Sequence, residues 1–252
     1  MKKVIEINNK KLIIVGTAHI SQKSKEQVKK TIEEERPEIV GIELDKQRFY
    51  SIMSKDRREI KFTDIFKARR PGVFFVQYFL AKYQKKIAGQ FNISPGAEMI
   101  QAINSAKEID AKILLADRDV NITLSRLLKS LNFRDKWKIF FSGFKIKKEL
   151  GDDLDINKIL SEVEKEDEEN TQINKIMDIF MKEHKKIKKI LIDERDLFIC
   201  YHIQKVLEDP NVNTIVLVVG AGHMPGIIKN IENKNINVKE LLIIKKVKVD
   251  KK

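Results

Sequence analysis

Residues 12–45, LIIVGTAHISQKSKEQVKKTIEEERPEIVGIELD, decide the fold. The apolar run Leu12 to Val15 predicts a strand that Gly16 ends, and residues 21–35 predict a helix because their apolar side chains recur at helical spacing. Residues 39–44 are again apolar and predict a short buried strand. The order strand, helix, strand predicts a β-α-β unit whose two strands are parallel neighbours in one sheet.

Two residues whose side chains can bind a ligand or transfer a proton lie at the ends of these strands. His19 lies just beyond the first strand, and Glu43 lies at the end of the second. Because ligands bind at the carboxyl ends of the strands in open α/β sheets, we expect both side chains at one binding site. Ahead of this unit, two β-branched runs at residues 4–7 and 12–15 flank Asn8-Asn9-Lys10-Lys11, a pattern that predicts a β-hairpin.

The far end of the chain repeats the pattern of the first strand. Thr214 to Val219 is an apolar run, and GAGHMPG follows it at residues 220–226. Gly16 to His19 and Gly220 to His223 both have the form G-x-x-H after an apolar strand, and in both the glycine permits close approach of backbone and ligand. We interpret the two segments as an internal duplication, and their common setting favours a functional role for both histidines.

Two imidazoles and one carboxylate are a recurrent ligand set for a divalent ion. Neutral nitrogen and anionic oxygen together suit zinc, manganese, cobalt or iron and leave positions open for water. We therefore expect His19, His223 and Glu43 to hold a metal ion. Two roles are open to Glu43, which either binds the ion or stands behind it as the base that takes a proton from water. We interpret His184 and His202 as ordinary structural residues.

Two clusters of mixed charge are candidates for contacts with a substrate. Asp117-Arg118-Asp119 follows an expected strand at residues 113–116, and Asp193-Glu194-Arg195-Asp196 lies inside an expected helix. A guanidinium group holds a carboxylate or an oxyanion in an active site, and it also serves in structural ion-pair networks, so both interpretations are open. The strand-end position favours a site role for Arg118 as much as a structural one. The helical position of Arg195 slightly favours a structural role.

The rest of the chain carries weaker patterns. An aromatic-rich helix over Pro71 to Ala88 is interpreted as a packing surface, with a membrane-surface or lid role as the alternative, and the acidic stretch Gly151 to Asn170 as a solvated helix face or loop. The other expected elements are a helix over Ala97 to Ile109, a helix over Thr171 to Cys200 that a basic cluster interrupts near Glu183 to Lys189, and a last strand over Glu240 to Val247.

Composition limits the class of protein. With 252 residues, of which 42% are hydrophobic, the chain is long enough for one large domain with a substantial core. The single cysteine, Cys200, excludes an internal disulfide and a zinc site made of cysteines, and its apolar neighbours predict a buried thiol. The formal charge is +13, but the 50 basic residues are scattered, so we expect no nucleic-acid partner. No apolar run approaches the roughly 20 residues that span a bilayer, and we expect a soluble chain.

Six motifs occur in order along nearly the whole chain: GTAHIS (16–21), GIELD with Arg48 (41–48), SPGAEMIQAI (94–103), LADRDVNITLSR (115–126), DERD (193–196) and VVGAGHMPGI (218–227). In this combination the sequence resembles the TraB/PrgY family. That family is grouped with the Tiki proteins, the erythromycin esterases and the ChaN-like proteins, whose shared marks are two G-x-x-H motifs and an intervening glutamate. The resemblance implies a mixed central α/β sheet built from two related β-α-β halves. It also implies a single domain over residues 1–252, with helical insertions at about 50–95 and 125–200.

The resemblance further implies a function, that of a metal-dependent hydrolase and most directly a metallopeptidase, because the Tiki branch contains manganese- or cobalt-dependent metalloproteases. Zinc is a further candidate for the ion. The metal ligands implied are His19, Glu43 and His223, and the catalytic residues implied are Glu43, Arg118, Arg195 and Glu98. Two alternatives stay open. One is a metal-independent esterase with histidine as the base, and the other is a binding protein that sequesters a peptide or haem.

Partners and location follow from the same resemblance. A peptide is the implied substrate, in keeping with the association of TraB/PrgY proteins with the shutdown of peptide pheromones. Many family members carry transmembrane helices after the G-x-x-H domain, whereas this chain stops at Lys252. We therefore expect a cytoplasmic protein, or the soluble domain of a protein that associates with a membrane through a segment absent from this chain. The aromatic helix near Phe74 to Tyr83 suggests a homodimer.

Overall fold

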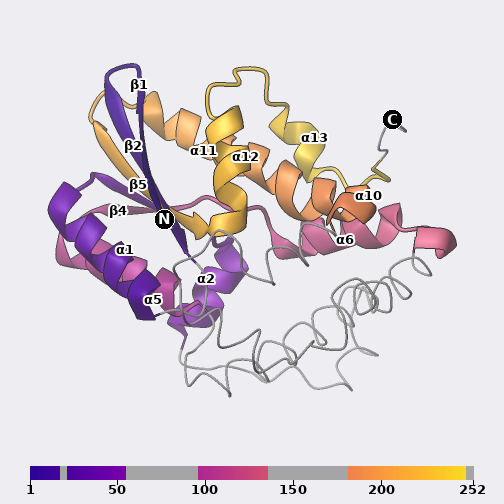
Figure 1. Ribbon diagram of the computed structural model, residues 1–252, viewed down its shortest axis with the longest axis horizontal. Helices are drawn as coiled ribbons and strands as arrows, with labels where there is room; N and C mark the ends of the chain where they lie inside the picture. Colours follow the sequence, from indigo (N-terminus) through magenta and orange to yellow (C-terminus); the bar gives the residue numbers. More distant parts are fainter. Residues whose placement is uncertain (18–21, 55–95, 136–180, 248–252) are drawn as a thin grey trace.

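The computed structural model describes residues 1–17, 22–54, 96–135 and 181–247 (Figure 1). The described residues form a mixed five-stranded sheet with the order β1-β2-β5-β3-β4. This confirms the predicted α/β class with a mixed central sheet, while the relation between two halves and the domain boundaries stay predictions. His19, the aromatic segment Pro71 to Ala88 and the acidic stretch Gly151 to Asn170 lie outside the described residues.

The sheet begins with the predicted hairpin. Strands β1 (Lys2–Ile7) and β2 (Lys10–Thr17) pair antiparallel, with Ile7 opposite Lys10. Asn8 and Asn9 form the turn with φ angles of 52° and 63°. Both angles lie in the left-handed region, which asparagine tolerates and which a type I′ turn requires at both central positions. The turn residues therefore fix the register of the hairpin.

Strand β5 (Thr214–Gly220) occupies the centre of the sheet, parallel to β2 on one side and to β3 (Ile39–Ile42) on the other. The expectation that the two strands of the first β-α-β unit are direct neighbours is therefore wrong, although they are parallel. All residues of β5 after Thr214 are buried. A strand that is apolar on both faces belongs at the centre of a sheet that is covered on both sides. This burial accounts for the place of β5 between the other two strands.

Helices cover both faces of the sheet (Figure 1). On one face, α1 (Gln22–Glu35) and α5 (Ala97–Glu108) form a core with Val216 and Val218 of β5. On the other face, α11 (Glu194–Leu207) and α12 (Met224–Asn230) form a second core with the alternate residues Ile215, Leu217 and Val219, and with the buried Cys200. Consecutive residues of β5 thus point into opposite cores, as the two-residue period of a strand requires.

Most of the other predicted elements are present. Strand β4 (Lys112–Leu115) pairs parallel with β3, but as the outer strand it is only partly buried. The helix predicted over Thr171 to Cys200 is interrupted at His184, inside the segment where the sequence predicts a break. It continues as α10 (Lys185–Lys188), the π-helix η1 (Lys189–Asp193) and α11. Helices α2 (Lys46–Met53) and α6 (Val120–Ser130) begin directly after the ends of β3 and β4.

The predicted last strand over Glu240 to Val247 is wrong. Residues Val238–Leu242 form the short helix α13, which Asn237 caps by accepting a hydrogen bond from the Glu240 backbone nitrogen at 3.3 Å. The backbone carbonyls of residues 240, 241 and 243 accept hydrogen bonds from buried arginine side chains. These contacts hold the segment against the buried arginines and away from the sheet. In the part of the chain that the structure describes, no helix has the length and apolar character needed to cross a bilayer.

Candidate functional site

The carboxyl ends of β3, β4 and β5 lie at one edge of the sheet, and ionisable residues follow each of them. Glu43 follows β3, Asp117 lies two residues after β4, and His223 lies in the short helix η2 (Ala221–His223) after β5. All three side chains are buried. The edge of the sheet therefore holds a desolvated group of charges, and its geometry follows from the three strand ends.

Glu43 is fixed to strand β5 at two points. Its backbone nitrogen donates to the carbonyl oxygen of Val218 at 3.2 Å. Its carboxylate oxygen Oε2 accepts from the backbone nitrogen of Gly220 at 2.7 Å. The second carboxylate oxygen, Oε1, is directed to the side chains of His223 and Arg195. One oxygen thus anchors the side chain while the other takes part in the site.

His223 lies between two carboxylates. Its Nε2 is 3.3 Å from Oε1 of Glu43, and its Nδ1 is 2.6 Å from Oδ1 of Asp196 in helix α11. Burial alone would lower the pKa of His223, but the hydrogen bonds to Asp196 and Glu43 raise it to about 9. The ring therefore carries a proton on both nitrogens near neutral pH when no other cation is present.

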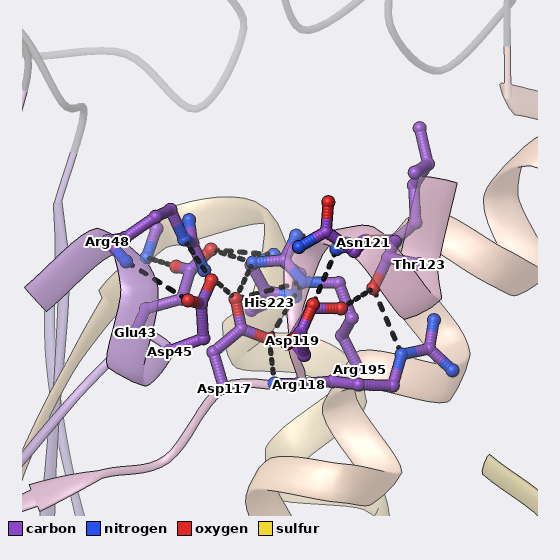
Figure 2. A network of polar contacts seen from close by, with 12 residues as sticks. Glu43, Asp45, Arg48, Asp117, Arg118, Asp119, Asn121, Thr123, Arg195 and His223 are labelled. Atoms are coloured by element: carbon purple, nitrogen blue, oxygen red, sulfur yellow. Dashed lines mark hydrogen bonds and ion pairs between the residues drawn. The ribbon is translucent and has the colours of Figure 1, made fainter. Parts of the chain in front are cut away.

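Seven charged side chains form one continuous series of contacts in which the sign of the charge alternates, and most of them are visible in Figure 2. We call this set the charge series. Its members, in order of contact, are Asp45, Arg48, Asp117, Arg195, Glu43, His223 and Asp196. Burial alone would raise the pKa of the Asp117 carboxyl, but Arg195 and Arg48 hold it below its usual range. The two guanidinium groups thus favour the ionised form of Asp117.

Arg195 bridges two of the acids. Its Nη2 contacts Glu43 and lies 2.7 Å from Oδ2 of Asp117, and its Nε lies 3.0 Å from Oδ1 of Asp117. Its Nη1 donates to the carbonyl of Leu191 in the π-helix η1 at 3.0 Å. Of Arg118 and Arg195, it is Arg195 that contacts Glu43, and its catalytic role stays a prediction.

Arg118 points away from Glu43 and His223. Its guanidinium group donates to Oε2 of Glu194 at 2.8 Å, to Oγ1 of Thr123 at 3.0 Å and to the carbonyls of Ile190 and Leu241. The side chain of Arg118 is fully buried in these contacts, and Figure 2 shows its bond to Thr123. The strand-end position leaves a site role and a structural role equally open for Arg118, and its catalytic role stays a prediction. Its contacts are those of a structural ion-pair network.

Arg126 completes this network. Its Nε and Nη2 donate to the two oxygens of Glu194 at 2.9 Å and 2.7 Å, and its Nη1 donates to the carbonyl of Glu240 at 3.1 Å. Glu194 thus lies between two buried guanidinium groups. Glu194 belongs to this network and Arg195 belongs to the charge series. Because the two residues are adjacent in α11, the network and the charge series meet at one turn of that helix.

Several residues of the site were not among those predicted. Asp117 and Asp45 belong to motifs quoted from the sequence, and their place just after parallel strands is a signal that could have found them. Asp196 gives no such signal, because its orientation depends on the phase of a helix that follows a π turn. Glu98 is buried in the first turn of α5, where a negative charge suits the helix dipole, and its catalytic role stays a prediction.

The spacing of Glu43 and His223 fits two ligands of one metal ion. In a tetrahedral site, metal bonds of about 2.0–2.2 Å place neighbouring ligand atoms roughly 3.3–3.6 Å apart, and the observed distance from Oε1 to Nε2 is 3.3 Å. Within the described residues, no group of three or more histidine, cysteine or acidic side chains has a metal-binding arrangement. The described residues alone thus show no complete ligand set, and the metal stays a prediction. Arg195 contacts the same oxygen of Glu43 and is also held by Asp117.

The strand that leads to the first G-x-x-H motif ends next to this pair. Thr17 of β2 is paired with Gly220 of β5, so the strands that precede the two histidines end at the same level of the sheet. Gly16 lies so close to Met224 that an added Cβ would be 2.1 Å from the methionine sulfur. The first glycine of the motif at residues 16–19 is thus required for contact with the segment that follows the second motif.

The fold and the site define an α/β protein with a buried ionisable centre at the carboxyl edge of its parallel strands. The sequence profile of the TraB/PrgY/gumN family matches residues 2–240. The chain belongs to this family, as the six sequence motifs indicated.

Relatives of the chain occur in archaea and in mammals. A protein of Methanocaldococcus jannaschii is 36% identical over 253 residues, which cover 96% of this chain and 59% of that protein. The TraB domain-containing proteins of Mus musculus and Homo sapiens are 28% and 27% identical over 261 residues, which cover 93% of this chain and 66% of each relative. The chain thus spans roughly three fifths to two thirds of the length of these relatives.

Proposed function

We propose that the protein is a metal-dependent hydrolase that cleaves peptides, with His223, Glu43 and His19 as the ligands of a divalent ion. The observation that carries the proposal is the pair formed by Nε2 of His223 and Oε1 of Glu43, 3.3 Å apart at the ends of neighbouring parallel strands. The pairing of Thr17 with Gly220 supports His19 as the third ligand, because the strand that precedes His19 ends beside the strand that precedes His223. Manganese or cobalt is the proposed ion, with zinc as the alternative.

The charges of the site support a divalent cation. With His223 neutral, the charge series carries four carboxylates and two guanidinium groups, and these side chains are largely buried. Buried charge is costly unless it is compensated. A doubly charged ion would balance this series, whereas the proton of His223 compensates only half of the deficit. We therefore expect metal binding to displace the proton from Nε2.

The residues of the site have distinct roles in the proposed reaction. A bound divalent ion would act as a Lewis acid that polarises the peptide carbonyl and activates water near neutral pH. In the alternative role of Glu43, behind the ion instead of bound to it, the carboxylate held by the backbone of Gly220 would accept the proton that the attacking water loses. Arg195 lies beside Glu43 and would donate to the oxygen on which negative charge develops. Peptide as the substrate rests on the resemblance to the Tiki metalloproteases.

The metal-independent esterase is the weaker alternative. A histidine base must be unprotonated to accept a proton, and the pKa of His223 is raised to about 9 by its two carboxylate neighbours. At neutral pH the imidazole would therefore be protonated and could not act as a base, unless a metal ion replaced the proton. The third possible function is that of a binding protein that sequesters a peptide or haem. It differs from the two hydrolases because a bound peptide would be released intact. Homodimer formation, membrane association and cellular location stay predictions.

The test is hydrolysis of a mixed peptide library by the purified chain, with manganese, cobalt, zinc or a chelator added in parallel and products identified by mass spectrometry. The variant His223→Ala removes the central ligand, and His202→Ala, in helix α11, is the matched control. The proposal predicts cleavage that requires both an added ion and His223 and that His202→Ala retains. Cleavage that persists in chelator would favour the esterase, and binding without cleavage would favour sequestration.

A further inference from the structure

Gly226 stands in an unusual place for a glycine. It lies inside helix α12, three residues after His223, and its φ is not in the left-handed region that favours glycine. Inside a helix, glycine is about 1 kcal/mol less favourable than alanine. The backbone conformation thus gives no reason for glycine at this position, and the reason must lie in the surrounding space.

The space beside Gly226 is filled by the carboxylate of Asp196. A Cβ added to Gly226 would lie 1.8 Å from Oδ2 and 2.7 Å from Cγ of Asp196. Real Cβ atoms essentially never approach another atom so closely. An alanine at this position would therefore displace the carboxylate. The aspartate is short, so its carboxylate cannot turn aside and still keep its other contact.

That other contact is the one with His223. Oδ1 of Asp196 is 2.6 Å from Nδ1 of the imidazole, and the aspartate is only 1% exposed. The carboxylate is thus wedged between the backbone of α12 and the ring of His223. Because Nδ1 is held by Asp196, the opposite nitrogen Nε2 is directed toward Glu43.

We propose that Asp196 is the positioning residue of His223 and that Gly226 is kept free of a side chain to make room for it. Asp196 acts through the imidazole, whose orientation it fixes and whose Nε2 it makes the better donor to a metal ion. Carboxylates that hold a ligating histidine in this way raise metal affinity about 10- to 100-fold. The effect on metal affinity rests on the proposed function, whereas the effect on the orientation of the ring does not.

The chain offers a matched control in the same segment. A Cβ added to Gly222 would meet no atom within 4 Å. Gly222→Ala and Gly226→Ala are therefore the same chemical change four residues apart, and only the second displaces Asp196. Asp196→Asn is the third variant. It keeps the shape of the side chain and removes its charge, so it tests the same contact without crowding the helix.

The experiment has two readouts on the full chain. The first is the set of ring ¹H and ¹⁵N resonances of His223 in the metal-free protein, identified by their loss in His223→Ala. The second is the affinity for cobalt or manganese by calorimetry. We expect shifted ring resonances and about 10- to 100-fold weaker ion binding in Asp196→Asn and Gly226→Ala, with wild-type behaviour in Gly222→Ala.

The inference is overturned if the ring resonances of Asp196→Asn and Gly226→Ala match those of the wild type. It is also overturned if they shift while ion affinity stays within about twofold of the wild-type value. If the wild type binds no ion, the proposed function fails, and the ring resonances still decide whether Asp196 positions His223. Should Gly226→Ala not fold, the isosteric Asp196→Asn gives the answer alone.

Discussion

Replacing Glu194 by glutamine should destabilise the fold strongly. The carboxylate of Glu194 accepts hydrogen bonds of 2.7–2.9 Å from Arg118 and Arg126, whose side chains are at most 2% exposed. The amide of glutamine keeps one acceptor oxygen but replaces the other oxygen with an NH₂ group, which faces a guanidinium group as donor against donor. The substitution also removes the negative charge of Glu194 from the contact. Two buried cations would then lack their counterion. Removal of one partner of a buried ion pair costs about 3–5 kcal/mol, and we expect Glu194→Gln to fall in that range.

The measurement is urea unfolding followed by circular dichroism. Under a typical dependence of stability on urea, a loss of this size lowers the midpoint by roughly 1–2 M. The matched control is Glu208→Gln, which removes an exposed contact with Lys205 and should change the free energy of unfolding by less than about 0.5 kcal/mol. If the two variants unfold at the same urea concentration, the reasoning about the buried network is refuted.

Three further predictions concern the site and its surroundings. Without added metal, the stabilisation from protonated His223 is complete below its unfolded pKa of 6.5 and is lost as pH rises through about 9, so the wild type should lose stability over that window and His223→Ala should not. Gly16→Ala should cost about 1–3 kcal/mol by crowding Met224, and adding Met224→Ala should recover part of that loss in a double-mutant cycle; strict additivity would contradict the contact. Burial raises the pKa of Cys200 to about 12, so a thiol reagent should modify it only after denaturant is added, and rapid labelling of the native protein would count against this environment.

The elements of the fold could largely be predicted from the sequence, but the order of the strands could not. The hairpin, helices α1 and α5 and the strands at residues 39–42 and 214–220 follow from apolar periodicity and turn residues. The insertion of β5 between β2 and β3 depends on burial of both its faces by helices that come from distant parts of the chain. The segment from Glu240 onward has an apolar pattern that suits a strand, and it is drawn into another structure because buried arginines bind its carbonyls.

The candidate site could be predicted in its position and less well in its composition. Glu43 and His223 lie together because parallel strands end at a common edge, which the strand pattern already implies. The partners of Arg195 could not be predicted, because neighbouring residues on a helix point about 100° apart. Consecutive residues of α11 thus have separate partners: Glu194 holds Arg118, Arg195 holds Glu43 and Asp196 holds His223. The π turn before α11 sets which way the side chains of that helix point, and no sequence pattern predicts this π turn.

The proposed metal site is tested most directly by the binding of cobalt or manganese to the purified chain in equilibrium dialysis. We compare the wild type with His223→Ala and Glu43→Gln, and use Glu208→Gln as the control. We expect the wild type and the control to bind one ion per chain, and the two site variants to lose this binding while circular dichroism shows an intact fold. Equal binding by all four proteins, or no binding by the wild type, would contradict it.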